Sequence, residues 1–224
     1  MKCEIQVRSI LQHAWAEIEH DLGYKTKEAI PVQSQRRFAR LAGLLELADD
    51  EFRGIRNDLE AYAETVGFQI AKDASKVQID KDSIAAYLAQ DAQLLRLGAQ
   101  MAAYEARELA AEDPEPYAGS LAVWLTYAGL ETIQDVQQAV EDEAELMIKY
   151  HQRHIALLRA SGLAQKGVLP KSHVPFRLGL VLIARRGEPS DIIAGIKKAG
   201  YSVVNDEEFA QSAVSALLEV EATP

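Results

Sequence analysis

Hydrophobic and polar positions alternate at the start of the chain and then change to helical spacing. The alternating apolar set is Cys3, Ile5 and Val7, and the polar set is Glu4, Gln6 and Arg8. A period of two predicts a β-strand with one apolar face and one polar face. Ser9 follows as a candidate N-cap, because its hydroxyl can accept a hydrogen bond from an unpaired backbone N–H. A helix is therefore expected directly after the strand.

This predicted helix has two faces. Its apolar stripe at helical spacing consists of Leu11, Ala14, Trp15, Ile18 and Leu22. A second stripe consists of His13, Glu17, His20 and Tyr24. A polar strand face that leads into a polar, aromatic-tipped helix face can line a cleft. Metal binding by the second stripe, nucleotide contact and an ordinary hydrogen-bonded surface are all open interpretations.

Apolar residues spaced three and four apart predict a long helix from about Ser34 to Val66, with Gly67 at its end. Residues 67–80 are polar and predict a linker. Helical patterns resume over residues 81–161, with an interruption near Gln90 and a capping box at Thr132. The stripe from Ile133 to Leu158 has nearly heptad spacing, which suits either a helix packed on its neighbours or a dimeric coiled coil.

The last segment, residues 162–224, predicts a small α/β tail. Residues 176–184 form an apolar run that reads as a buried strand, although a helix is possible. Pro189 opens a helix that Gly200 closes, residues 201–204 form a short strand, and residues 206–220 form a last helix. The expected fold is mainly α, of the α+β class. Its parts are residues 1–66, a linker at 67–80, a helical region at 81–161 and the tail.

Composition narrows the classes of protein. The 224 residues include 48% hydrophobic residues and carry a formal net charge of −10, which disfavours a nucleic-acid partner. A single cysteine cannot form an internal disulfide and fits a reducing compartment. The sequence has no transmembrane pattern and no signal peptide, so we expect a cytoplasmic protein that does not bind membranes.

The first twenty-five residues resemble a known family. Glu4-Ile-Gln-Val-Arg-Ser9, followed by His13-Ala-Trp-Ala-Glu-Ile-Glu-His20 and Tyr24-Lys25, is similar to the distal half of the RelA/SpoT (p)ppGpp synthetase domain. The stand-alone alarmone synthetases are the subgroup it resembles most. A weaker similarity continues to Tyr62 and covers the long helix that follows in that family. The resemblance implies a nucleotidyltransferase-like domain.

The resemblance also implies an activity, which is transfer of pyrophosphate from ATP to the 3′-hydroxyl of GDP or GTP with magnesium as cofactor. Glu4 matches the catalytic glutamate, which binds magnesium or activates the 3′-hydroxyl, and a carboxylate suits either task. Gln6 and Arg8 would order the site and bind nucleotide. His20 and Lys25 match positions near the nucleotide pocket, where Lys25 would be a mobile charge on phosphate.

The chain departs from this family in one respect. A basic nucleotide-binding loop, an aspartate-bearing strand and a tyrosine-serine-histidine segment should form the upstream half of the domain, and the sequence contains none of them. We therefore expect a truncated chain that is not competent alone. The alternative is a non-catalytic helical interaction or regulatory protein derived from the synthetase fold. In either case the long helices offer a surface for homo-oligomer formation.

Overall fold

The computed structural model describes residues 3, 5–23, 31–111, 116–163 and 167–222, and these form α-helices with no β-strand. Two compact units divide the chain, an N-terminal unit of residues 1–62 and a C-terminal unit of residues 63–224. The helices are α1 (Ile10–Gly23), α2 (Val32–Asp73), α3 (Lys81–Gln90), α4 (Ala92–Glu105), α5 (Pro116–Ala128), α6 (Ile133–Asp142), α7 (Ala144–Ala160), α8 (His173–Ala184), α9 (Pro189–Ala199) and α10 (Asp206–Glu221). Within the described residues, no helix is both long and apolar enough to cross a membrane.

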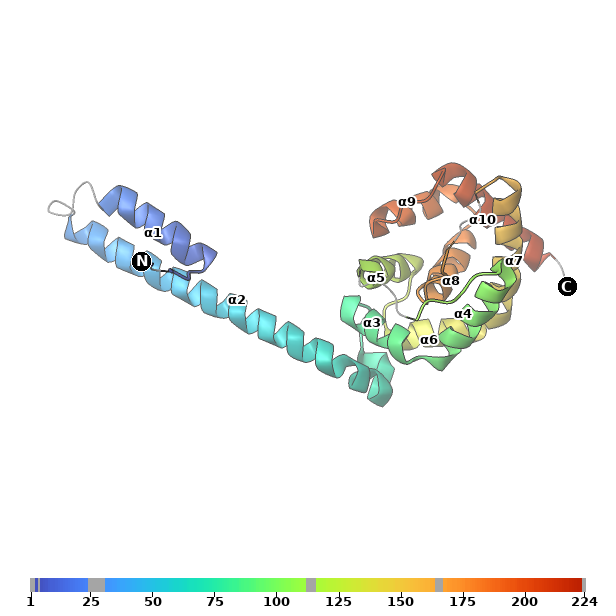
Figure 1. Ribbon diagram of the computed structural model, residues 1–224, viewed down its shortest axis with the longest axis horizontal. Coiled ribbons are helices and arrows are strands. Elements are labelled where there is room, and N and C mark those ends of the chain that lie inside the picture. Colours follow the sequence, from blue (N-terminus) through green and yellow to red (C-terminus); the bar gives the residue numbers. More distant parts are fainter. Residues whose placement is uncertain (1–2, 4, 24–30, 112–115, 164–166, 223–224) are drawn as a thin grey trace. The chain divides into compact units, whose positions relative to one another are not determined.

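The N-terminal unit is a helical hairpin in which α1 lies along the first part of α2 (Figure 1). Ser9 caps α1 as predicted, because its hydroxyl accepts from the Gln12 backbone N–H at 3.0 Å while the Gln12 side chain accepts from the Ser9 N–H. The Ser9 hydroxyl also donates to Asp49 at 2.5 Å, and the rings of Trp15 and Phe38 lie 5.6 Å apart. These contacts fix the two helices against each other.

The predicted strand over residues 3–8 is wrong for the residues described. Residues 5–9 have no strand pairing, and Ile5 and Val7 are 83% and 92% exposed. A strand needs a neighbour for its backbone N–H and C=O groups. The alternating pattern was present, but no described segment of the N-terminal unit supplies an edge on which it could pair.

The long helix does not end at Gly67, as predicted, but continues to Asp73, after which a short 3₁₀ turn covers Ala74–Lys76. Gly67 serves packing instead. A Cβ at this position would lie 2.4 Å from Nε2 of Gln90, so a larger residue would have to displace that flexible side chain.

The C-terminal unit packs helices α3–α10 into one core, with α8 buried among them. Local caps explain where several of these helices begin. Asp80 caps α3, Asp91 separates α3 from α4 and caps the latter, and Thr132 forms a capping box with Asp135 at α6. The break near Gln90 and the Thr132 box confirm their predictions. The stripe from Ile133 to Leu158 is divided between α6 and α7 and lies inside this core.

The predicted strand–helix–strand tail is wrong. Residues 176–184 belong to helix α8, and residues 201–203 form no strand. A continuous apolar run fits a buried helix as well as a buried strand, because both faces are covered in either case. The intervening helix α9 and the last helix α10 confirm their predictions, and Gly200 ends α9 with a positive φ of 73°.

A close approach of helices to Trp124 yields the first testable prediction. A Cβ at Gly195 in α9 would lie 2.8 Å from the Trp124 ring and 2.7 Å from Tyr127, whereas a Cβ at Gly119 in α5 would meet nothing within 4 Å. Gly195→Ala should lower the free energy of unfolding by about 1–3 kcal/mol through overpacking. Gly119→Ala should raise it by up to ~1 kcal/mol, because alanine is the better helix former. Chemical denaturation of both variants measures the difference, and equal effects would contradict this packing.

Candidate functional site

The residues that the sequence assigned to the nucleotide site fall into two groups. Glu4 and Lys25 lie outside the described residues. Gln6, Arg8 and His20 are described and are exposed in the N-terminal unit. The His20 ring lies 3.9 Å from the Asp21 carboxylate, and its side chain is 66% exposed. The predicted roles of all five residues stay predictions.

Arg8 lines a surface cleft of about 340 Å³ between the extended segment 7–9 and helix α2. Its other polar walls come from Ser9, Gln12, Asp49, Arg53 and Arg56, and its apolar walls from Val7 and Phe52. Three arginines and one aspartate thus line the cleft, and the Asp49 carboxylate already accepts from Ser9. Arg53 pairs with Asp50 at 2.8 Å, whereas Arg8 and Arg56 have no ion-pair partner among the described residues. Guanidinium groups in this density suit phosphate oxygens.

Arg53 and Arg56 could not be assigned to this cleft from the sequence. They lie in the middle of a long helix with many charges, and nothing in their spacing points to Arg8. Their position follows from the register of the hairpin, which the Ser9–Asp49 hydrogen bond fixes. The spacing of Asp49, Phe52, Arg53 and Arg56 puts these residues on one helical face. It does not show that this face lies beside Arg8.

A metal site on the stripe of His13, Glu17 and His20 finds no support in the described residues. The single group of three potential ligands there lies in the C-terminal unit and comprises Glu105, His151 and His173, whose donor atoms lie within 4.8 Å of one another. Oε1 of Glu105 and both ring nitrogens of His151 are buried without an aligned hydrogen bond. Oε1 of Glu105 lies 3.3 Å from Nε2 of His151. This cluster was not predicted, since its members come from α4, α7 and α8.

Arg177 decides whether that group can hold a metal. Its Nε donates to Nε2 of His173 at 2.9 Å, and its Nη1 donates to Nδ1 of His154. A neutral imidazole that accepts at Nε2 carries its proton on Nδ1. His173 therefore has no free lone pair for a metal while the Arg177 bond is intact. Two neighbouring guanidinium groups, Arg107 and Arg177, would also repel a cation. The donor set does not fit a bound metal ion.

Burial sets the charge states of the cluster. It lowers the pKa of His154 and of His173 well below the usual 6.5, and the positive charge of Arg177 acts in the same direction. Both histidines are therefore neutral at pH 7. Burial alone would raise the pKa of Glu105, but His151 and Arg107 beside it lower that pKa on balance. A carboxylate, two guanidinium groups and neutral imidazoles thus share one interior region.

The chain has no match among known proteins in any of three comparisons. No protein-family model, no curated protein and no solved structure is similar to it at the thresholds applied. Function must therefore be argued from the residues and from the two sites described above.

Proposed function

We propose that the chain is the distal part of a RelA/SpoT-class (p)ppGpp synthetase, which moves pyrophosphate from ATP to the 3′-hydroxyl of GDP or GTP. The motif from Glu4 to Lys25 supports this assignment. The cleft around Arg8 adds a physical reason, because it offers unpaired guanidinium groups next to that motif. Activity would need the upstream half of the domain, which the 224 residues do not contain.

The exposed apolar surface of the N-terminal unit is the observation that carries the proposal. None of its described residues is fully buried, and Ile5, Val7 and Ile10 are 83%, 92% and 87% exposed. A segment with such large unburied side chains gains little from the hydrophobic effect by itself. A sheet and core laid against residues 5–10 would cover this surface. The upstream half of a nucleotide-binding domain would have that role.

A carboxylate and several guanidinium groups suit the proposed pyrophosphate transfer. The 3′-oxygen of the acceptor attacks the β-phosphorus of ATP, the bond from that phosphorus to the α,β-bridging oxygen breaks, and AMP leaves. Glu4 would take the hydroxyl proton or bind magnesium, which neutralises phosphate charge when it is bound. Arg8, Arg53 and Arg56 would position phosphate oxygens. Positioning and charge stabilisation supply most of the rate in transfers of this type.

Replacement of the carboxylate tests the proposal. The substitution Glu4→Gln is introduced in the native cells, and the variant protein is then isolated. It should synthesise (p)ppGpp about 100-fold more slowly or worse, because glutamine can neither accept the proton nor bind the cation as strongly. Thin-layer separation of labelled products measures the rate. Glu46→Gln, an exposed carboxylate on α2, is the matched control and should leave the rate unchanged.

The isolated 224-residue chain gives the complementary result. We expect no measurable synthesis from ATP with GTP or GDP. Robust synthesis by this chain alone would show that the upstream segments are not essential. Near-normal activity of Glu4→Gln in the native protein would remove Glu4 from the catalytic role.

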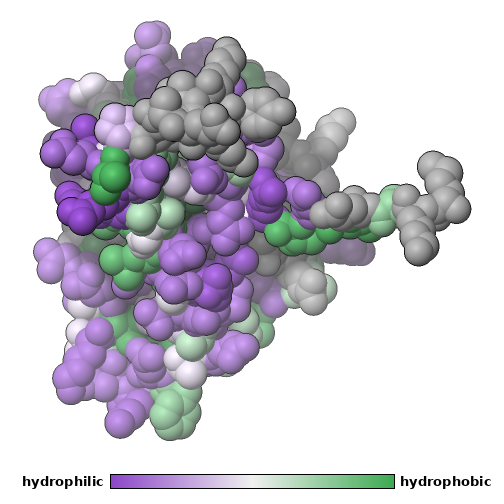
Figure 2. All heavy atoms as spheres, turned by 90° about the vertical axis from the view of Figure 1, so that its left-hand side faces the viewer, coloured by the Kyte–Doolittle hydropathy of each residue, from purple (hydrophilic) through white to green (hydrophobic). Residues whose placement is uncertain are grey.

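A non-catalytic interaction protein is the second candidate, and one observation favours it. On α2 the apolar side chains of Leu41, Phe52, Ile55 and Leu59 recur at steps that suit a coiled coil, and each is 50% to 65% exposed. Figure 2 draws the side of the molecule that is on the left in Figure 1, and it shows hydrophobic groups separated by hydrophilic ones. If this candidate is correct, the native protein should form a complex through α2 and should lack alarmone synthesis.

A further inference from the structure

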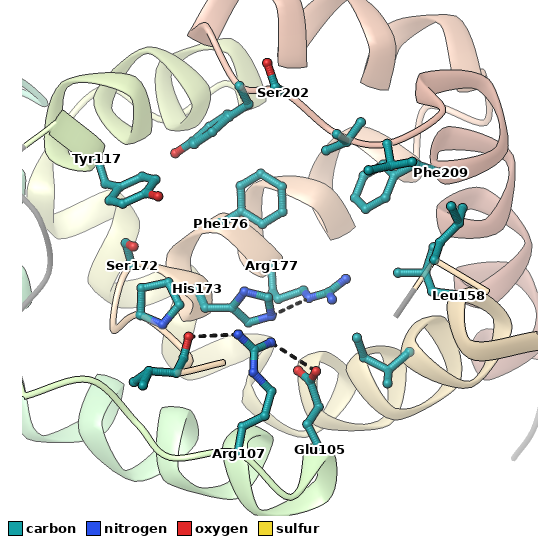
Figure 3. Close-up of a pocket in the computed structure, with 17 residues that line it drawn as sticks. Glu105, Arg107, Tyr117, Leu158, Ser172, His173, Phe176, Arg177, Ser202 and Phe209 are labelled. Carbon is teal, nitrogen blue, oxygen red and sulfur yellow. Dashed lines mark hydrogen bonds and ion pairs between the residues drawn. The ribbon is translucent and has the colours of Figure 1, made fainter. Parts of the chain in front are cut away.

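A second cavity lies entirely within the C-terminal unit and has no place in the proposed transferase reaction. Its volume is about 380 Å³, within the range of small-molecule sites. Figure 3 shows Glu105, Arg107, His173 and Arg177 gathered at one end, with the rings of Phe176 and Phe209 beyond them. Val204 lines the cavity and is 76% exposed, and Val168 and Tyr117 line it at 53% and 42% exposure. The cavity is therefore open to solvent on one side.

The charged end carries an excess of positive charge. Among the described residues, two arginines and one carboxylate are the charged groups that line the cavity. Arg107 forms an ion pair with that carboxylate, because its Nη1 lies 3.2 Å from Glu105. Its Nε and Nη2 donate to the carbonyls of Gly167 and Val168 at 2.8 Å. Arg107 is thus a paired structural cation, and the surplus charge resides on Arg177.

Arg177 is 2% exposed and has no carboxylate within ion-pair distance among the described residues. Its Nε and Nη1 donate to neutral imidazoles, and the Tyr150 hydroxyl also interacts with it. The chain of donors is fixed: Arg177 donates to His154, His154 donates from Nε2 to the Ser212 hydroxyl at 3.0 Å, and Ser212 donates to the Phe209 carbonyl at 2.8 Å. A buried guanidinium without a carboxylate in direct contact is costly, although the charge of Glu105 attracts it from a longer distance. Arginine cannot escape that cost by deprotonation, because its guanidinium remains charged in proteins.

His173 adds a neutral donor to the same end. Because its Nε2 accepts from Arg177, its proton is on Nδ1, and Nδ1 has no hydrogen-bond partner in the described part of the chain. Beyond this polar end the walls are aromatic and aliphatic. The Phe176 ring packs edge-to-face on Tyr201 at 5.1 Å, and Ile155, Leu158 and Phe209 complete the apolar side. The cavity thus combines cationic and donor groups at its base with an apolar upper part.

We propose that this cavity binds a small organic anion, with its carboxylate or phosphate group against Arg177 and His173 and its apolar body among Phe176, Leu158 and Phe209. The anion supplies the direct ion pair that no described carboxylate forms with Arg177. The aromatic walls bind the body and exclude water from the ion pair. Metal binding at the same end is disfavoured, because His173 lacks a free lone pair and the surplus charge is positive.

Isothermal titration of the 224-residue chain with matched probes tests this site. The probes are 3-phenylpropionate and phenyl phosphate, the neutral analogue 3-phenylpropan-1-ol, and acetate and inorganic phosphate without a ring. At least one aromatic anion should bind once per chain and at least tenfold more tightly than both the alcohol and the ringless anions. Comparison of the two aromatic anions shows whether the head group is a carboxylate or a phosphate. Absence of binding at 10 mM, or equal binding of acid and alcohol, would overturn the proposal.

Variants assign the binding to this cavity. Arg177→Gln should remove the tenfold advantage of the anion over the alcohol. Val204→Trp should fill the solvent-exposed mouth and weaken both probes, whereas Leu218→Trp, at a residue 63% exposed on α10 that does not line the cavity, should leave binding unchanged. If Arg177→Gln does not fold, judged by circular dichroism, the Val204 and Leu218 pair decides. Equal binding by those two variants would place the probe elsewhere and would contradict the proposal.

Discussion

Trp124→Ala should lower the free energy of unfolding of the C-terminal unit by about 3–5 kcal/mol, the range for truncating a buried aromatic side chain. Trp124 is fully buried in α5, and its Nε1 donates to the Phe176 carbonyl at 3.0 Å. Its ring stacks on Phe176 at 5.2 Å and meets Tyr201 edge-on. The backbone at Gly179 approaches so closely that a Cβ there would lie 2.3 Å from the indole nitrogen. Truncation leaves a cavity that these rigid neighbours cannot close.

Urea denaturation followed by circular dichroism measures this loss without relying on tryptophan fluorescence. Val123→Ala is a suitable control, because Val123 is the adjacent residue of the same helix and is 38% exposed. Val123→Ala should lower the free energy of unfolding by well under half as much as Trp124→Ala does. A loss below about 1 kcal/mol for Trp124→Ala would contradict its place at the centre of this core.

Acid should destabilise the C-terminal unit well above the pH at which carboxylates titrate. His154 is fully buried, and burial lowers the pKa of His154 and of His173 well below 6.5. Between the folded pKa values and about 6.5 the unfolded chain therefore binds more protons, so stability falls as the pH falls through this window. From pH 7 to pH 5 the loss can reach at most about 2 kcal/mol for each of these two histidines.

The measurement is the free energy of unfolding as a function of pH. His154→Gln should make the fall in stability between pH 7 and pH 5 smaller, by up to about 2 kcal/mol, whatever the variant's stability at pH 7. His20→Gln removes an exposed histidine of the N-terminal unit and should preserve the full decrease. Stability that is constant down to pH 5 would show that the buried histidines are not held neutral.

Local signals in the sequence were sufficient for most helices. Ser9, Asp91, Thr132 and Gly200 mark helix ends by capping chemistry that acts within a few residues, and each is found at such an end. The apolar run at 176–184 could not be resolved in the same way. Whether it forms a strand or a helix depends on the neighbours that cover both of its faces, and those come from distant parts of the chain.

The two sites differ in how much of each could be predicted from the sequence. Arg8 was predicted as a phosphate ligand from a motif, and the structure brings it beside Arg53 and Arg56 through the register of the α1–α2 hairpin. The cavity in the C-terminal unit had no local signature, because Glu105, His173 and Arg177 come from α4 and α8. His151 and His154 were visible as a spaced pair, but their partners and their neutral state follow only from the packing.

The measurement that most directly tests the central claim is an alarmone synthesis assay on the protein isolated from its native cells. ATP labelled at the γ-phosphate is incubated with GDP or GTP and magnesium, and the products are separated and identified by mass. The assignment predicts a guanosine product that carries the labelled pyrophosphate on its 3′-oxygen, together with an equal amount of AMP. An intact native protein that forms neither product with either acceptor would contradict it, and would favour an interaction protein that retains only the surface of a synthetase.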